Sequence, residues 1–145
     1  MTLRPDLIVA NLRVTGLLMA ALVVLNIFIP RRFGWREELS RVSLVNRQIF
    51  RVHTFFLVVT LALFSALLLT SADALVEPTR LARAVLLGLT IFWGLRMLMQ
   101  WFYYSPALWR GRRFNTAMHL LFSGLWIYVT AVFAVALYFS TSLPR

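Results

Sequence analysis

Four long apolar runs, separated by short polar breaks, make up most of the chain. They cover about residues 7–29, 50–71, 82–104 and 116–139. Each run is close to the roughly 20 residues that a membrane-spanning helix needs. We therefore predict an all-α integral membrane protein, with a single domain over residues 1–145 that forms an antiparallel four-helix transmembrane bundle. The first run lacks a small-residue cleavage pattern, so it is predicted to be a membrane helix and not a signal peptide.

The polar break between the first two runs, residues 30–49, has a pattern of its own. Apolar residues recur there at helical spacing, at Trp35, Leu39, Val42 and Ile49. Glu37 precedes Arg41 by four residues, which suits an ion pair along one helix. We predict a short interfacial helix on the membrane surface, with a solvated loop as the alternative.

Composition supports a membrane location and narrows the chemistry. Hydrophobic residues make up 61% and charged residues 14% of the chain, against about 45–50% and 25% in soluble domains. Cysteine is absent, which excludes disulfides, thiolate metal sites and cysteine nucleophiles. The formal charge of +10 comes from arginines that flank the apolar runs, so we expect contacts with membrane lipid headgroups and no nucleic acid.

The distribution of arginines predicts the orientation. Nine lie in or beside the first and third connections, namely Arg31, Arg32, Arg36, Arg41, Arg47, Arg51, Arg110, Arg112 and Arg113. Five lie on the other side, namely Arg4, Arg13, Arg80, Arg83 and Arg145. By the positive-inside rule, loops 30–49 and 105–115 are cytoplasmic and both termini are outside, in a bacterial inner (cytoplasmic) membrane.

The third run carries an arginine deep within it. A charge near the middle of a membrane helix costs roughly 2.5–3.5 kcal/mol on insertion scales, so Arg96 needs compensation. Gln100 and Tyr103 follow at helical spacing, and the three residues form a polar stripe on one helix face. No acidic residue lies in any predicted span, so the counter-charge must come from Glu37 or Glu38, a ligand, a lipid phosphate or another subunit.

The predicted orientation brings further polar residues to the same leaflet. Asn26 lies near the cytoplasmic end of the first run, and the two histidines lie near the cytoplasmic starts of the second and fourth. We predict a ligand site in the cytoplasmic leaflet, formed by Asn26, His53, Arg96, Gln100, Tyr103 and His119. Helix N-termini and Arg96 would together favour an anion or a carbonyl group.

Several functions fit these residues. One is a quinone or lipid site, for which the aromatic residues of the third run offer a flat wall at Phe92, Trp93, Trp101 and Tyr103. Another is a b-type haem ligated by His53 and His119, with Arg96 on a propionate. A third is an accessory subunit without a ligand, paired with other membrane subunits or with copies of itself. In the simplest alternative, Arg96 only extends toward the interface and the other polar residues only link helices.

No motif for catalysis is present. Phosphate-binding glycine loops, zinc-binding His-Glu-x-x-His spacing and carboxylate pairs within the spans are absent, which favours a protein that is not an enzyme. The segments Trp35-Arg36-Glu37-Glu38-Leu39, Asn46-Arg47-Gln48-Ile49-Phe50 and Phe92-Trp93-Gly94-Leu95-Arg96 through Gln100-Trp101-Phe102 resemble those of small uncharacterised bacterial four-helix membrane proteins. The resemblance implies four spans and assigns no functional residue.

Overall fold

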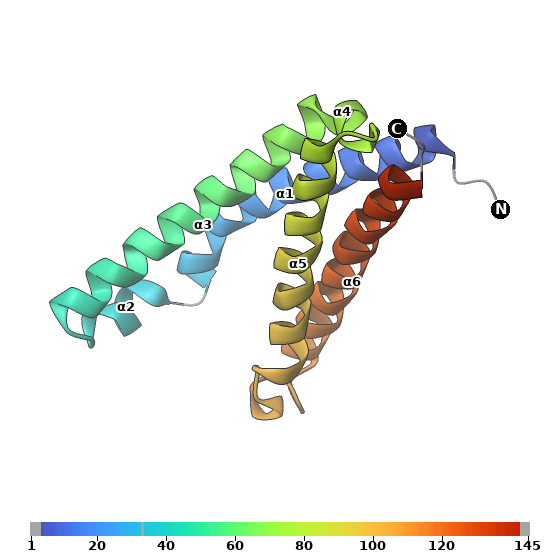
Figure 1. Ribbon diagram of the computed structural model, residues 1–145. Coiled ribbons are helices and arrows are strands. Elements are labelled where there is room, and N and C mark those ends of the chain that lie inside the picture. Colours follow the sequence, from blue (N-terminus) through green and yellow to red (C-terminus); the bar gives the residue numbers. More distant parts are fainter. Residues whose placement is uncertain (1–3, 33, 143–145) are drawn as a thin grey trace. The chain divides into compact units, whose positions relative to one another are not determined.

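The computed structural model describes residues 4–32 and 34–142, without the side chains of residues 29–32. Every element in this part of the chain is helical (Figure 1): α1 (Pro5–Arg32), α2 (Trp35–Ser40), α3 (Leu44–Thr70), α4 (Ala72–Val76), α5 (Arg80–Phe102), the 3-10 helix η1 (Pro106–Leu108) and α6 (Arg113–Ser142). Four helices, α1, α3, α5 and α6, are long and apolar enough to cross a membrane. The all-α class and four helices of spanning length and hydropathy are confirmed, while the antiparallel bundle remains a prediction.

The helix boundaries differ from those predicted, mainly at the polar ends. Helix α3 begins at Leu44, because Ser43 is its N-cap and accepts a hydrogen bond from the Asn46 N–H at 3.4 Å. Helix α6 begins at Arg113, before the predicted residue 116. The short helices α4 and η1 lie in the polar breaks between the predicted spans. Hydropathy detects the membrane core of a helix and misses the polar turns that extend it.

The predicted helix between the first two spans exists as α2, with six residues. Its Glu37 pairs with Arg41 at 2.8 Å, as the spacing predicted, and both side chains are exposed. Trp35 makes an edge-to-face contact with Phe50 of α3, with ring centroids 5.0 Å apart. The position of α2 on a membrane surface remains a prediction. Of the arginines used for the orientation, Arg145 and the side chains of Arg31 and Arg32 lie outside the described residues.

The chain divides into two compact units. The first, called here the α1–α3 unit, covers Arg13–Ser71. In it α1 and α3 approach closely at Gly16, where an added Cβ would lie 3.0 Å from Leu69 Cγ and 3.1 Å from Leu68 Cβ. The buried Ser65 Oγ donates to the Gly16 carbonyl at 2.9 Å. A small residue and an interhelical hydrogen bond therefore join these two helices.

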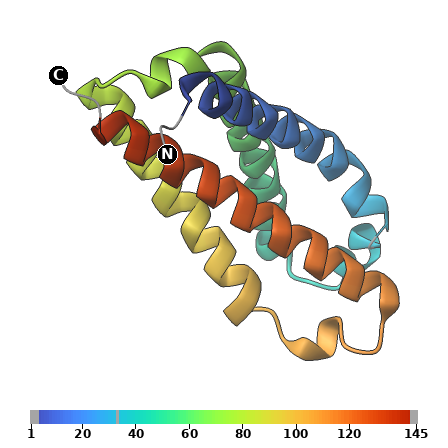
Figure 2. The same ribbon diagram turned by 90° about the vertical axis from the view of Figure 1, so that its right-hand side faces the viewer.

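The second unit, called here the hairpin unit, comprises Met1–Leu12 and Ala72–Arg145. Helices α5 and α6 lie side by side along their length and are joined at one end by the segment that contains η1 (Figures 1 and 2). Leu86 of α5 and Val129 and Phe133 of α6 are fully buried apolar side chains. Thr79 caps α5 by accepting from the Ala82 N–H at 3.1 Å.

Candidate functional site

A buried glutamine connects α5 to α6 near the loop that joins them. The side chain of Gln100 is only 6% exposed. Its Oε1 accepts from Arg96 Nη1 at 3.2 Å, and its Nε2 lies 3.1 Å from His119 Nδ1. One amide thus links an arginine on its own helix to a histidine on the facing helix. This relay is the candidate functional site of the hairpin unit.

The relay fixes the tautomer of His119. A guanidinium can only donate hydrogen bonds, so the oxygen of the Gln100 amide faces Arg96 and its nitrogen faces His119. That nitrogen is a donor, and therefore His119 Nδ1 is the acceptor. In this arrangement the ring proton lies on Nε2. The site consequently presents an N–H donor at the far side of the ring.

The loop between α5 and α6 places the ring of Trp109 against the imidazole of His119. The Trp109 ring stacks on the imidazole with centroids 4.5 Å apart and planes 6° apart. Thr116 fixes this part of the loop by donating from Oγ1 to the Trp109 carbonyl at 2.6 Å. Gly111 takes a φ of 77° before α6 begins, a conformation that favours glycine. The ring of His119 is therefore held from two sides, by Gln100 and by Trp109.

Arg96 extends from the relay to a second aromatic group. Its guanidinium carbon lies 4.8 Å from the ring centroid of Trp126, a cation–π contact. Trp126 in turn stacks on Trp93, with centroids 5.1 Å apart and planes 17° apart. Such a contact is worth about 0.5–2 kcal/mol, more where water is excluded. The contact offsets part of the cost of placing a charge in a membrane helix.

Buried polar atoms on α6 lack hydrogen-bond partners among the described residues. They are Trp126 Nε1, Ser123 Oγ and Thr130 Oγ1. Trp126 is only 5% exposed, so its N–H is removed from solvent as well. An unsatisfied buried donor costs about 1–3 kcal/mol. The ring that contacts Arg96 therefore carries a donor that a bound acceptor would satisfy.

The site contains a positive charge and no negative one. Helices α5 and α6 contain no acidic residue. Within the described part of the chain, no group of three or more His, Cys, Asp or Glu side chains could hold a metal ion. The ionisable and polar ends of Arg96, His119 Nε2 and Trp126 are all donors. The ligand that complements them is one that supplies acceptor oxygen atoms.

The structure brings together three of the six residues predicted for the site, namely Arg96, Gln100 and His119. Tyr103 is the C-cap residue of α5, is 78% exposed and packs edge-to-face on Tyr104. Asn26 and His53 belong to the α1–α3 unit. Each bonds to its own helix, Asn26 Nδ2 to the Leu22 carbonyl at 2.8 Å and His53 Nδ1 to the Ile49 carbonyl at 2.9 Å. Their membership in one site with Arg96 remains a prediction.

The two histidines differ in the tautomer that their bonds require. His53 Nδ1 faces a carbonyl and so donates, and only the tautomer with its single proton on Nδ1 would have a lone pair on Nε2 to ligate a metal. His119 has its proton on Nε2 and would need a reversed Gln100 amide to ligate iron through that atom. Haem ligation by His119 would therefore require its hydrogen bond with Gln100 to change from the one in the relay. The haem hypothesis remains a prediction.

Sequence reasoning missed Trp109 and Trp126. A signal for Trp126 existed, because His119, Phe122 and Trp126 follow at intervals of three and four residues and share a helix face. No such signal pointed to Trp109, whose contact with His119 depends on the path of the loop. Of the aromatic residues that we expected to form a wall, Trp93 is buried in the contact with Trp126 and Trp101 is largely exposed.

The chain matches no protein-family model, and searches of curated proteins and of solved structures found no significant match. The function proposed below is inferred from the geometry of the hairpin unit.

Proposed function

We propose that this multi-pass membrane protein binds a lipid-soluble ligand with carbonyl or other acceptor oxygens, of the quinone or lipid class, and acts as a subunit of a larger membrane complex. The Arg96–Gln100–His119 relay carries the proposal. It orients two donors, the guanidinium and His119 Nε2–H, while the Gln100 amide is occupied by holding them in place. Binding, and not catalysis, is the role that these groups support.

Aromatic rings favour a quinone over an aliphatic lipid at this site. The indoles of Trp109 and Trp126 lie at the two ends of the relay, against His119 and Arg96. Both rings already belong to aromatic stacks, on His119 and on Trp93, so a flat ligand would extend these stacks; the buried Trp126 N–H would donate to a carbonyl of a ligand whose binding exposes it. Because α5 and α6 contain no acid, the charge of Arg96 must be balanced from elsewhere, by Glu37 or Glu38, a ligand, a lipid phosphate or another subunit.

Ligand binding should depend on the planar guanidinium of Arg96. We expect Arg96→Leu to weaken binding of a short-chain ubiquinone by about tenfold or more, which corresponds to about 1.4 kcal/mol. Arg96→Lys should bind the quinone nearly as weakly as Arg96→Leu, because an ammonium lacks the planar fork of arginine. Quenching of tryptophan fluorescence in detergent-purified protein would measure the affinity, because Trp93 and Trp126 lie beside Arg96.

The two histidines provide a matched control. His119→Gln should weaken quinone binding, whereas His53→Gln should leave it unchanged if the site is confined to the hairpin unit. A loss with both variants would instead support the wider six-residue site. A phosphatidylglycerol titration in place of quinone would identify a lipid ligand, and an absorption spectrum with a Soret band would identify haem. An Arg96→Leu variant that binds quinone as tightly as the wild type would contradict the proposal.

The proposal also includes the orientation, with loops 30–49 and 105–115 in the cytoplasm of a bacterium. Because the chain has no cysteine, single cysteines can be introduced without a background. Arg112→Cys, in the exposed loop before α6, should be protected from an impermeant thiol reagent in spheroplasts. Arg80→Cys, at the other end of α5, is the matched control and should be labelled. Labelling in the opposite pattern would reverse the orientation and place the site in the outer leaflet.

A further inference from the structure

Ser123 of α6 lies on the helix face that carries the relay. It is four residues after His119 and three before Trp126, so the three side chains share one face of α6. His119 meets Gln100 of α5. Trp126 meets Arg96, one turn earlier on α5. Ser123 lies between these two contacts along α6, and it is therefore level with the turn of α5 that runs from Arg96 to Gln100.

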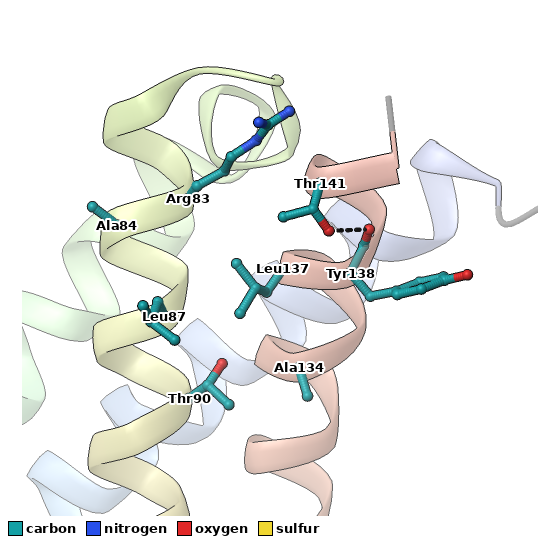
Figure 3. Close-up of a pocket in the computed structure, with 8 residues that line it drawn as sticks. All are labelled: Arg83, Ala84, Leu87, Thr90, Ala134, Leu137, Tyr138 and Thr141. Carbon is teal, nitrogen blue, oxygen red and sulfur yellow. Dashed lines mark hydrogen bonds between the residues drawn. The ribbon is translucent and has the colours of Figure 1, made fainter. Parts of the chain in front are cut away.

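The hydroxyl of Ser123 lacks the hydrogen bond that the hydroxyls of helices commonly make. Thr54, Thr60 and Thr90 each donate to the carbonyl four residues earlier on their own helix, at 2.9, 2.8 and 2.7 Å. Thr90 does so even where it lines a groove between α5 and α6 (Figure 3). Ser123 Oγ is buried and has no hydrogen-bond partner among the described residues. Its hydroxyl can therefore donate to a bound ligand.

Arg96 and Trp126 supply further donors beside this hydroxyl. The contact of Arg96 with Gln100 uses Nη1, and a guanidinium carries several more N–H groups. The guanidinium carbon lies 4.8 Å from the ring centroid of Trp126. Trp126 is buried, and its N–H has no partner among the described residues. The three side chains thus offer donors around one positive charge, and α5 and α6 contain no acid to balance it.

We infer that a halide ion, chloride under physiological conditions, binds between α5 and α6 against Arg96, Ser123 and Trp126. Buried charges in proteins are paired, and a halide brings one negative charge to the one guanidinium. Charge-assisted hydrogen bonds are stronger than neutral ones, and a spherical ion accepts them from any direction. A phosphate group carries a charge of about −1.5 to −2 at pH 7, which exceeds the charge of one arginine.

The halide would use Arg96 and Trp126, which are also donors of the proposed quinone site. The two ligands should therefore compete, and chloride would regulate the binding of quinone. This regulation rests on the proposed function, whereas the binding of chloride depends only on the three donors. Chloride binding is therefore measured first without quinone.

Equilibrium dialysis against radiolabelled chloride, in gluconate buffer of constant ionic strength, tests the site in detergent-purified full-length protein. The wild type should bind one chloride per chain and saturate. Ser123→Ala should weaken this binding by about tenfold, whereas Thr130→Val should leave it unchanged. Thr130 Oγ1 is also buried without a partner among the described residues, but Thr130 lies seven residues from Ser123, about 10 Å along a helix.

Substitutions of Arg96 separate the halide site from the quinone site. Arg96→Leu should abolish chloride binding. Arg96→Lys should keep most of it, because a spherical ion needs the positive charge and not the planar fork of arginine. The same lysine variant should bind quinone weakly. In the wild type, an excess of chloride over gluconate should weaken quinone binding.

Three results would overturn the inference: no saturable chloride binding by the wild type, equal losses for Ser123→Ala and Thr130→Val, or full chloride binding by Arg96→Leu. Quinone binding by a protein that does not bind chloride would overturn this inference alone. Chloride binding by a protein that does not bind quinone would contradict only the proposed function. A quinone affinity that is independent of chloride would overturn the competition between the two ligands.

Discussion

The two units of the chain differ in the side-chain hydrogen bonds that join their helices. In the α1–α3 unit, several polar side chains bond to the carbonyl four residues earlier on the same helix, as Asn26, His53, Thr54 and Thr60 do. In the hairpin unit, Gln100 and Arg83 bond from α5 to α6.

In the α1–α3 unit, Ser65 does make a hydrogen bond between helices. Ser65 reaches the carbonyl of Gly16 because the glycine has no side chain to separate the helices. The close approach of α1 and α3 depends on the missing Cβ of Gly16. In the hairpin unit, the longer side chain of Gln100 reaches from α5 to His119 on α6. We therefore expect the free energy of unfolding to respond differently to substitutions in the two units.

The largest effect is expected at Gly16. A leucine there would collide with Leu68 and Leu69, since even a Cβ would lie 3.0–3.1 Å from their atoms. We expect Gly16→Leu to lower the free energy of unfolding by about 3 kcal/mol, the upper part of the range for overpacking. Reversible unfolding in mixed micelles would measure it.

Gly88 is the control for this substitution, because nothing lies within 4 Å of a Cβ built there. Gly88→Leu should change the free energy of unfolding by no more than about 0.5 kcal/mol. Equal losses for Gly16→Leu and Gly88→Leu would show that helix contact at Gly16 is not what stabilises the α1–α3 unit.

A smaller effect is expected when the relay is removed. Gln100→Leu leaves Arg96 and His119 without their shared partner, and we expect a loss of about 1–2 kcal/mol. Asn26→Leu removes only a bond within α1, so it should cost less than about 0.5 kcal/mol. The same unfolding assay applies to both variants. A cost for Asn26→Leu as large as that for Gln100→Leu would remove the distinction between the two units.

The smallest effect is expected at Ser65. Ser65→Ala removes its hydrogen bond to Gly16 without adding volume, and bonds of this kind in membrane proteins average about 0.6 kcal/mol. Ser71→Ala, at the C-cap of α3, is a control outside the α1–α3 contact. A loss at Ser65 near that at Gly16 would mean that the hydrogen bond, and not the close approach, joins α1 to α3.

Hydropathy alone was enough to predict the helical class and the four spans, because a membrane helix must be apolar over a fixed length. The stripe of Arg96 and Gln100 was also visible, since helical spacing determines which residues share a face. The residues that contact each other across two helices were less predictable from the sequence. The spacing of His119 and Trp126 marks a face of α6, but it does not specify that this face meets Gln100 and Arg96.

Side-chain hydrogen bonding explains why the predicted site and the observed relay contain different residues. Asn26 and His53 are polar residues in apolar runs, as Gln100 is, yet each bonds to its own helix. Nothing in sequence spacing separates the two outcomes, because both types of residue have a carbonyl four positions earlier. Trp109 could not have been found either, because its stack on His119 depends on loop contacts such as Thr116 to the Trp109 carbonyl.

The bond between Gln100 and His119 has a consequence for biogenesis. A helix whose polar groups are satisfied internally can enter the bilayer alone, whereas Gln100 finds its acceptor only on α6. During synthesis α5 leaves the ribosome before α6, with Arg96 and Gln100 lacking that partner. The two helices should therefore partition into the membrane together as a preformed pair. Truncation of the nascent chain before residue 119 should retain α5 in the insertion machinery.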